Sequence, residues 1–464
     1  MASIADAGAA PAVRPVFTLG YRRWMLFLLV TIYACSFLDR VIISTIGPAI
    51  IHDLKLTDLE FGLLGGAAFA VFYALFGLPI AWLAERASRV NIIAVCIALW
   101  SAMTAFSGLT STYLQLLACR MAVGVGEGGC SPAAHSLLSD HYPPKQRASA
   151  LAIYSIGVPI GTLLGAIAGG WIAQTFSWRT ALIMVGAPGL VLALLARLTL
   201  REPARGHSEA AAVAAKAPSL GAVLARLGRT RTFFHITAGF VLINLAANGV
   251  NIFTSTYLVR SFHLGLARAG LLYGLAVGIA GIFGMLVGGF GADAAGRRDT
   301  RWYAWGPAIG ALVAMPLYAW AFTRTDAIST MGFFFSGALL MSLYFAPTMA
   351  IVQNMVEPRM RASASALMFL LINIVGQGFG PTVMGAISDV MSHQVLAPGG
   401  AFSICPVGAN APTQLIQACA APSAGGLEAA ILTMTLFFLW GAIHYLLAAR
   451  TIRADTGLGV TPPR

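Results

Sequence analysis

The feature that most constrains this chain is a succession of long apolar stretches, twelve in our interpretation, separated by short loops that carry most of the charge. The hydrocarbon core of a bilayer, roughly 30 Å thick, is spanned by about 20 helical residues, so each stretch can cross it. Of the 464 residues, 58% are hydrophobic and only 10% are charged, too few charges for a soluble surface of this size. The sequence therefore predicts an all-α membrane protein with twelve transmembrane helices.

The predicted spans form two groups of six. The first group comprises residues 24–49, 60–83, 90–110, 112–139, 147–173 and 178–199. The second group comprises residues 232–259, 267–292, 302–323, 328–356, 361–391 and 427–449. These runs are continuous and rich in Ala, Leu and Gly, whereas a membrane β-barrel would show segments of about ten residues with alternating polarity. Helices are therefore expected throughout.

A polar segment, residues 200–231, separates the two groups and carries several arginines. The loss of the apolar pattern over this length predicts a cytoplasmic linker. We therefore divide the chain into an N-terminal six-helix half, residues 24–199, and a C-terminal six-helix half, residues 232–449. Residues 1–23 and 450–464 are expected to be cytoplasmic tails.

Short motifs recur at matching places in the two halves. Residues Ala81–Arg89 follow the second span and residues Gly289–Arg298 follow the eighth, each with an acidic residue ahead of basic ones. The tetrapeptide Arg-Ala-Ser-Ala opens the fifth span at Arg147 and the eleventh at Arg361. Such recurrence indicates an internal repeat. Two pseudo-symmetric halves are the arrangement in which transporters alternate access by rocking about a site near the bilayer midplane.

The basic residues predict the orientation of the chain. Placing both termini in the cytoplasm puts most of the 29 Lys and Arg residues on that side, as basic residues near membrane ends require. The net charge of +12 is then explained by topology and by attraction to anionic lipid heads. Since no basic soluble domain exists, nucleic-acid binding is not expected. We predict a multi-pass protein of a bacterial-type inner (plasma) membrane.

On these features the chain resembles the major facilitator superfamily over essentially its whole length, which implies the major facilitator fold. The first loop motif is degenerate, with Ala81, Glu85 and Ser88 where the superfamily usually has Gly, Asp and Gly. The second copy of the motif is closer to the usual pattern.

Two further segments resemble one family within the superfamily. Phe37-Leu-Asp-Arg40 in the first span, and the segment from Arg120 to Pro132 in the fourth, with its Gly-Val-Gly-Glu-Gly run and Ser-Pro ending, are similar to the spinster family of proton-linked lysolipid and sphingolipid transporters. A neighbouring family of organic anion symporters also carries an Asp-Arg pair at the corresponding place in the first span. The resemblance therefore narrows the function without fixing the substrate.

Four charged side chains lie deep in the predicted spans. Asp39 and Arg40 are in the middle of the first, while Arg120 and Glu127 are seven residues apart in the fourth, about two turns and hence on one face. A charge near the bilayer centre costs roughly 2.5–3.5 kcal/mol on insertion scales, so each needs a partner or a water-filled cavity. The two acids and two bases can neutralise one another.

The spinster resemblance implies that Asp39 and Glu127 are the proton-coupling acids, with Arg40 and Arg120 as charge partners or as anchors for an anionic head group. A poorly solvated carboxylate tends to take up a proton and a nearby Arg opposes this, so movement of the Arg would gate the proton. Arg also suits phosphate or carboxylate, because its fork donates two parallel hydrogen bonds. The alternative is a purely structural ionic cluster between the two helices.

Polar and aromatic side chains elsewhere are candidates for lining a central cavity. Asn244, Asn248 and Asn251 form one helical stripe, and Asn373 and Gln377 repeat the i, i+4 spacing. Hydrogen bonding between helices explains these amides equally well. We expect a cavity that is charged on one side and apolar on the other. The aromatic candidates are Phe69, Tyr73, Tyr154, Tyr273 and Tyr344.

The repeated loop motifs are expected to form cytoplasmic charge networks that hold the halves together when the site faces outward. They are interpreted as conformational elements, not as substrate sites. Their members are Glu85, Arg86 and Arg89 after the second span, and Asp293, Arg297 and Arg298 after the eighth.

Two of the six cysteines, Cys405 and Cys419, fall in the long loop before the last span, which the charge distribution places outside. Disulfides persist outside the cytoplasm, so these two are the candidate disulfide. No spacing typical of a metal site occurs. The glycine-rich run Gly124–Gly129 lacks the Lys-Ser/Thr of a phosphate-binding loop, so no cofactor is expected.

These features favour a secondary active transporter that works by alternating access. The first hypothesis is proton-coupled movement of an amphiphilic, lysolipid-like anion across the inner membrane. The alternative is a proton symporter for small organic anions such as sugar acids or aromatic carboxylates. An enzyme is not expected, because the spans hold no paired nucleophile and base. The expected partners are the substrate, protons and membrane lipids, and the protein is expected to be a monomer.

Overall fold

The computed structural model describes residues 17–203, 220–356, 360–395 and 420–456, and every regular element in these ranges is helical. Eleven helical segments of the described part are long and apolar enough to cross a membrane. The remaining predicted span, the fourth, corresponds to α5, a helix of 29 residues with a more polar composition.

The elements before residue 204 correspond to the first six predicted spans. They are α1 (Leu19–Leu54), α2 (Asp58–Gly62), the π-helix η1 (Leu63–Ala67), α3 (Ala68–Ala84), α4 (Arg89–Ser107), α5 (Tyr113–His141), α6 (Pro144–Ser155), α7 (Gly157–Thr175) and α8 (Trp178–Thr199).

The elements after residue 219 comprise one short helix and those of the last six predicted spans. They are α9 (Leu220–Gly228), α10 (Arg231–Phe262), α11 (Leu266–Gly296), α12 (Trp302–Phe322), α13 (Ala327–Met341), the 3₁₀-helix η2 (Ser342–Tyr344), α14 (Phe345–Asn354), α15 (Arg361–Leu371), the π-helix η4 (Ile372–Phe379), α16 (Gly380–Val395) and α18 (Ala420–Thr456).

Polar residues in the loops determine where several helices begin. Thr57 and Glu60 form a capping box at the start of α2, in which each side chain accepts the backbone N–H of the other residue at 2.9 Å. Ser88 and Asp326 likewise accept first-turn N–H groups at the starts of α4 and α13. These N–H groups have no partner inside the helix, so a polar cap stabilises the start of the helix.

The helices differ from the predicted spans in length and continuity. The first helix begins at Leu19 rather than at residue 24, and the last extends to Thr456 rather than to residue 449. Four spans expected to be continuous change helix type or break along their length, because η1, η2, η4 and the break before Gly157 interrupt them. The local sequence is apolar on both sides of each interruption, so hydrophobic patterning gives no signal of it.

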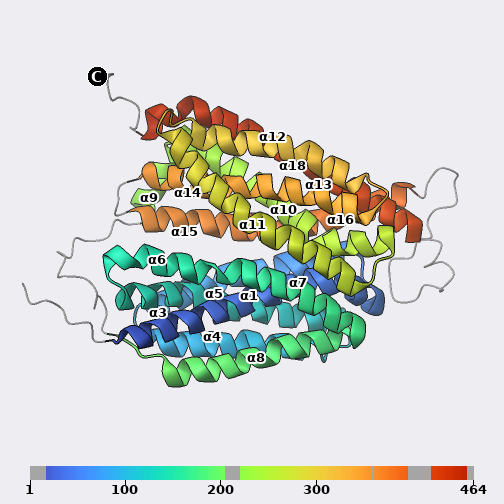
Figure 1. Cartoon of the computed structure of the whole chain (residues 1–464), viewed down its shortest axis with the longest axis horizontal. Helices are drawn as coiled ribbons and strands as arrows, with labels where there is room; N and C mark the ends of the chain where they lie inside the picture. Colours follow the sequence, from blue (N-terminus) through green and yellow to red (C-terminus); the bar gives the residue numbers. More distant parts are fainter. Residues whose placement is uncertain (1–16, 204–219, 357–359, 396–419, 457–464) are drawn as a thin grey trace, which may run out of the picture.

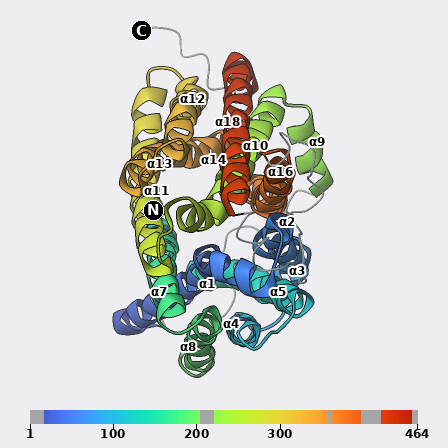
Figure 2. The ribbon, with the colours of Figure 1, turned by 90° about the vertical axis from the view of Figure 1, so that its right-hand side faces the viewer.

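The helices form two layers (Figure 1). Helices α1 to α8, blue to green, make the N-terminal layer, and α9 to α18, green-yellow to red, make the C-terminal layer. The view along the bundle shows where the layers meet, with α7 beside α11 and α2 beside α16 (Figure 2). Contacts of α1 with α10 and of η1 with η4 complete this interface.

The two ends of the bundle differ in how tightly the layers join. We call the end with the start of α1 and the end of α18 the termini end, and the opposite end the distal end. Backbones of the two layers touch toward the distal end, where a Cβ added to Gly62 would collide with the carbonyl of Pro381. The larger cluster of buried apolar side chains likewise joins the C-terminal layer to the distal parts of α1, η1 and α7. The layers are therefore closed together at the distal end.

Candidate functional site

The structure brings the four deep charges together as two acid–base pairs between α1 and α5. Arg40 Nε donates a hydrogen bond to Glu127 Oε2 at 2.6 Å, and Ser36 Oγ donates to the same oxygen at 2.8 Å. Arg120 Nη1 lies 3.7 Å from Asp39 Oδ2, close enough for an ion pair. The Arg40 side chain is 16% exposed, whereas the Glu127 side chain is fully buried. Arg40 is therefore the member of the site that a solute can reach.

Aromatic rings surround Arg40. The guanidinium carbon lies 4.9 Å from the ring centre of Phe37, 4.8 Å from that of Phe69 and 4.9 Å from that of Tyr73. Arg120 lies 5.4 Å from the same Phe69 ring. Cations are attracted to ring faces, so these rings help to hold both arginines. Phe69 and Tyr73, predicted as cavity lining, are thus neighbours of the charges.

Two glycines of α5 allow this packing. A Cβ at Gly124 would collide with the carbonyl of Phe69, and a Cβ at Gly128 with the carbonyl of Tyr73. Because α5 presents no side chain at these positions, α3 approaches its backbone closely. That approach places the rings of α3 over the arginines and buries Glu127 between the helices.

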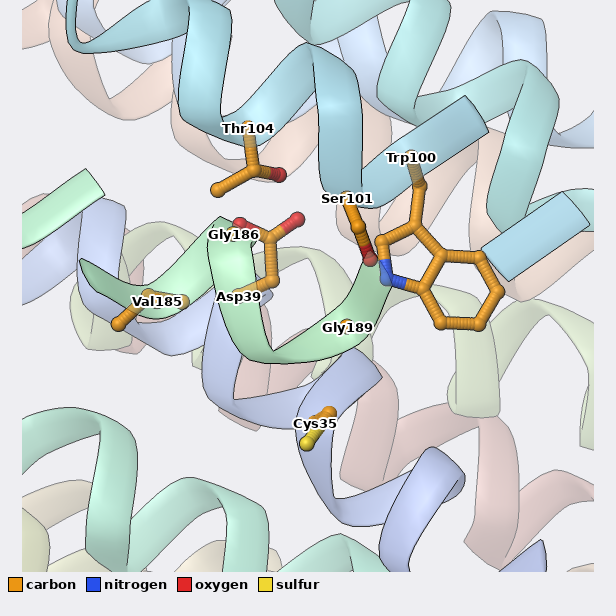
Figure 3. A pocket seen from close by; sticks show the side chains of 8 residues that line it. All are labelled: Cys35, Asp39, Trp100, Ser101, Thr104, Val185, Gly186 and Gly189. Carbon is orange, nitrogen blue, oxygen red and sulfur yellow. The ribbon is translucent and has the colours of Figure 1, made fainter. Parts of the chain in front are cut away.

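Asp39 has a different environment from Glu127. Neither oxygen of its carboxylate has a hydrogen-bond partner in the described part of the protein, nor has the nearby hydroxyl of Thr104. Asp39 and Thr104 line a small cavity between α1, α4 and α8, together with Ser101 and Cys35 (Figure 3). The centre of a water molecule has about 10 Å³ of room there, close to the minimum for one bound water. Buried polar groups normally bind water where protein partners are missing.

Polar side chains of the C-terminal layer form a second cluster. Asn244 Nδ2 donates to the hydroxyl of Tyr344 at 2.6 Å, and Asn248 Nδ2 donates to Asn244 Oδ1 at 2.7 Å. Asn248, Asn251 and Tyr344 line a cavity of about 210 Å³ bounded by α10, α11 and the elements α12 to α14. The amide stripe predicted from the sequence therefore makes hydrogen bonds and lines a cavity at once.

The other cavity candidates are placed differently. Tyr154 is buried and stacks on Tyr33, with ring centres 4.4 Å apart. Tyr273 is buried in the apolar core. Asn373 donates to the backbone of its own helix, at Phe369 O, and Gln377 lies in η4. The structure does not bring these four candidates to either of the cavities described above.

An ion cluster that the sequence analysis missed joins the layers at the distal end. Both Nη atoms of Arg260, at the end of α10, donate to the Asp58 carboxylate at 2.8 and 2.6 Å. Ser388 Oγ donates to Asp58 at 2.6 Å, and Asp389 accepts the N–H groups of Asp58 and Leu59. The sequence signal was limited to an acidic residue after a capping Thr, which predicts a helix start and no partner.

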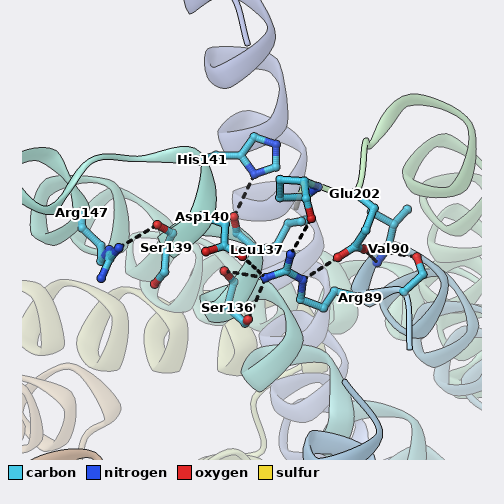
Figure 4. A network of polar contacts seen from close by, with 11 residues as sticks. Arg89, Val90, Ser136, Leu137, Ser139, Asp140, His141, Arg147 and Glu202 are labelled. Atoms are coloured by element: carbon cyan, nitrogen blue, oxygen red, sulfur yellow. Dashed lines mark hydrogen bonds and ion pairs between the residues drawn. The ribbon is translucent and has the colours of Figure 1, made fainter. Parts of the chain in front are cut away.

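Arg89 lies in a charge network within the N-terminal layer (Figure 4). It donates to Glu202 at 2.6 Å and to Asp140 at 2.5 Å, and its side chain is 1% exposed. The expected partners Glu85 and Arg86 are instead exposed and 3.9 Å apart. Asp140 and Glu202 were not identified from the sequence, because each is a single acid at the end of a span.

The second predicted network has fewer described contacts. Arg297 and Arg298 are exposed at the end of α11, and the side chain of Asp293 lies outside the described part of the structure. Nearby, Arg453 donates to Asp299 at 2.6 Å. Cys405 and Cys419 lie outside the described residues, so their pairing stays a prediction. The four described cysteines are free thiols.

We expect Glu202→Gln to lower the free energy of unfolding by about 1.5–3 kcal/mol, the range for a hydrogen bond to a charged group. Burial raises the pKa of Glu202, but the N–H of Val90 and the Arg89 guanidinium outweigh it and lower this pKa overall. The stabilisation is therefore complete above the unfolded pKa of about 4.3 and is lost as pH falls through the folded pKa.

Thermal unfolding followed by tryptophan fluorescence at pH 7 and pH 4 checks this prediction. The unfolding midpoint of Glu202→Gln should lie clearly below that of wild type at pH 7, and the difference should be smaller at pH 4. Glu85→Gln is the matched control, since Glu85 is an exposed acid at the same end. Equal midpoints for wild type and Glu202→Gln at pH 7 would contradict the prediction.

Comparison with known proteins defines the class of protein that has this fold and this site. The model of the Major Facilitator Superfamily matches residues 29–381, and the chain belongs to that superfamily. It is 33% identical over 367 residues to an MFS-type efflux pump of Mycolicibacterium smegmatis, covering 78% of this chain and 83% of that one.

Within the superfamily the chain is related to the spinster proteins. It is 26% identical over 388 residues to protein spinster of Drosophila melanogaster, covering 81% of this chain and 64% of that one. A solved bacterial homologue of the human lysosomal transporter Spinster, in an inward-facing and unoccupied conformation, superposes with a TM-score of 0.86. The two are 30% identical, and 95% of this chain and 99% of that one are covered. The predicted fold and the spinster resemblance are confirmed, and the chain is a multi-pass membrane transporter and not an enzyme.

Proposed function

We propose that this transporter is a proton-coupled secondary carrier that works by alternating access and moves an amphiphilic, lysolipid-like anion across a bacterial-type inner membrane. We further propose that it acts as a monomer among membrane lipids with both termini in the cytoplasm. The observation that carries the proposal is the bond between the partly exposed Arg40 and the buried Glu127. Arg40 is thus accessible to an anionic substrate and is bonded directly to Glu127, an acid that is shielded from water in this conformation.

The coupling follows from competition for Arg40. While Glu127 is ionised, it holds the guanidinium by a hydrogen bond from Nε. Protonation of Glu127 removes its charge and releases Arg40 to bind a phosphate or carboxylate through its fork. Asp39 and Arg120 form the second pair. Their atoms are 3.7 Å apart, too far for a hydrogen bond, so Asp39 is held less tightly than Glu127. Loss of either acid should therefore uncouple proton movement from substrate movement.

The closed distal end gives the conformational part of the proposal. With the predicted orientation, the distal end faces outside and the termini end faces the cytoplasm, so this conformation would load or release substrate on the cytoplasmic side. Opening to the outside must then break the bonds from Arg260 and Ser388 to Asp58. The superposition on an inward-facing relative supports this assignment.

One observation favours the second candidate, a proton symporter for small organic anions. The cavity of the C-terminal layer, about 210 Å³, is below the roughly 300–1,000 Å³ of a site that encloses a whole drug-sized ligand. An aromatic carboxylate, with its ring in this cavity and its carboxylate toward Arg40, would use both parts of the site. A long acyl chain would have to extend beyond the cavity.

Proton flux in proteoliposomes tests the proposal and separates the two candidates. Wild-type protein is challenged with lysolipids of increasing chain length and with aromatic and sugar acids, while internal pH is recorded. Flux evoked by lysolipids supports the first candidate, and flux evoked only by small acids supports the second. Arg40→Ala is tested beside wild type. If every anion evokes the same flux in both proteins, or none evokes any flux, the proposed coupling is wrong.

A further inference from the structure

The cavity of the C-terminal layer is lined without any charged side chain. Its wall is mostly apolar and carries five side chains with polar atoms, Asn248, Asn251, Tyr318, Ser342 and Tyr344. The charges of the proposed transport site belong to α1 and α5 in the other layer. The apolar part of the wall includes Ala247, Val277, Met285, Met341 and Phe345.

Asn248, Asn251 and Tyr344 each retain hydrogen-bonding capacity. Asn248 Nδ2 donates both its hydrogens to Asn244, to the backbone O at 2.9 Å and to Oδ1 at 2.7 Å, which leaves Asn248 Oδ1 as an acceptor. The Tyr344 oxygen accepts from Asn244, so its own O–H can donate. The side-chain amide of Asn251 makes no hydrogen bond among the described residues. The wall therefore offers donors and acceptors together, with no net charge.

The size of the cavity sets the size of its occupant. An engineered cavity of about 150 Å³ in another protein binds benzene. A cavity of about 210 Å³ accordingly has room for a ring-sized group and one or two attached heavy atoms. An apolar group alone would leave the amide of Asn251 without a partner and the O–H of Tyr344 without an acceptor, and an unsatisfied polar group that a ligand covers costs free energy. The better occupant therefore brings its own polar atom.

We infer that this cavity is the subsite for a neutral, ring-sized part of the substrate that carries a hydroxyl or amide group. The inference rests on the proposed transport of an anion whose charged end binds Arg40. It makes the substrate bipartite, because the anionic group and the hydrogen-bonding ring are recognised by different layers. Binding both parts at once bridges the two layers, which is what a carrier needs if the substrate is to promote their movement.

Two uncharged probes, 4-methylphenol and toluene, isolate this subsite from the charged one. Calorimetric titration into the full-length protein in lipid nanodiscs should show 4-methylphenol binding about fivefold more tightly, as expected for one additional hydrogen bond. Asn251→Leu should remove that preference while toluene still binds. Asn91→Leu, the same change at an exposed position in the other layer, should keep it. Thermal unfolding verifies that both variants are folded.

The outcomes for the subsite and for the transport proposal are separable. Equal binding of the two probes to wild type, an unchanged preference in Asn251→Leu, or binding of neither probe would overturn the subsite. Arg40→Ala should leave probe binding unchanged while it abolishes anion-evoked flux. Probe selectivity that depends on Asn251, found together with flux that does not depend on Arg40, would support the subsite and overturn the coupling.

Discussion

Glu127→Gln is expected to abolish substrate-driven proton flux while it preserves, or strengthens, binding of the anion. The change removes the only acid bonded to Arg40 in the described structure, so the guanidinium is left free to bind substrate. Breaking a buried ion pair by removing one partner costs about 3–5 kcal/mol, which corresponds to about two to nearly four orders of magnitude in an equilibrium constant. Asp39→Asn should also abolish coupling, without the gain in anion binding, because Asp39 faces Arg120.

Proton flux and substrate counterflow in proteoliposomes measure this difference. Uncoupled variants should still exchange substrate across the membrane, because exchange needs no net proton movement. Asp326→Asn is the matched control, since Asp326 is an exposed N-cap of α13 and Asn caps helices equally well. Full proton coupling in both Asp39→Asn and Glu127→Gln would show that the four charges form a structural cluster only.

Asp58→Asn is expected to shift the protein from the distally closed conformation toward the distally open one. Asp58 is almost fully buried and receives hydrogen bonds from Arg260 and Ser388 across the layer interface. With the same 3–5 kcal/mol for a broken buried pair, the equilibrium between the two conformations should shift by at least about 100-fold. Such a shift suffices to populate a conformation that is otherwise rare.

Distances between spin labels at Leu114→Cys and Ile328→Cys report the opening of the distal end, in protein whose six native cysteines are replaced by alanine. The distance should lengthen in Asp58→Asn. Asp53→Asn is a close control, because Asp53 bonds Arg179 at 2.5 Å within a single layer. If both variants keep the wild-type distance, the Asp58 cluster does not hold the layers together.

Periodicity in the sequence predicted the parts of the site that depend on one helix at a time. Seven residues separate Arg120 from Glu127, so the α-helix itself puts them on one face. The amide stripe of Asn244, Asn248 and Asn251 in α10 follows from the same geometry: Asn248 bonds Asn244, and Asn248 and Asn251 line the same cavity. The cost of charge in the membrane predicted that the four deep charges would meet, whatever the angles between helices.

Which acid meets which base was decided by packing between helices. Asp39 and Arg40 are adjacent on α1 and point in directions about 100° apart, and each meets a different charge of α5. The sequence contains no measure of how α1 is rotated against α5. The orientation of α5 depends on contacts with other helices as well, such as the close approach of Gly124 to the backbone of α3.

The sequence by itself determined that the chain lies in a lipid bilayer, that it is helical, that it contains a repeat and which charges lie deep in the membrane. These properties depend on hydrophobicity and on spacing along the chain. Only the tertiary structure decided the Asp58–Arg260 bond, the pairing of Arg89 with Asp140 and Glu202 rather than with Glu85, and the position of the cavity beside Asn251. Each of these joins residues far apart in the chain, 202 residues in the case of Asp58 and Arg260. Such pairs are selected by the fit of whole helices, and local sequence contains no information about that fit.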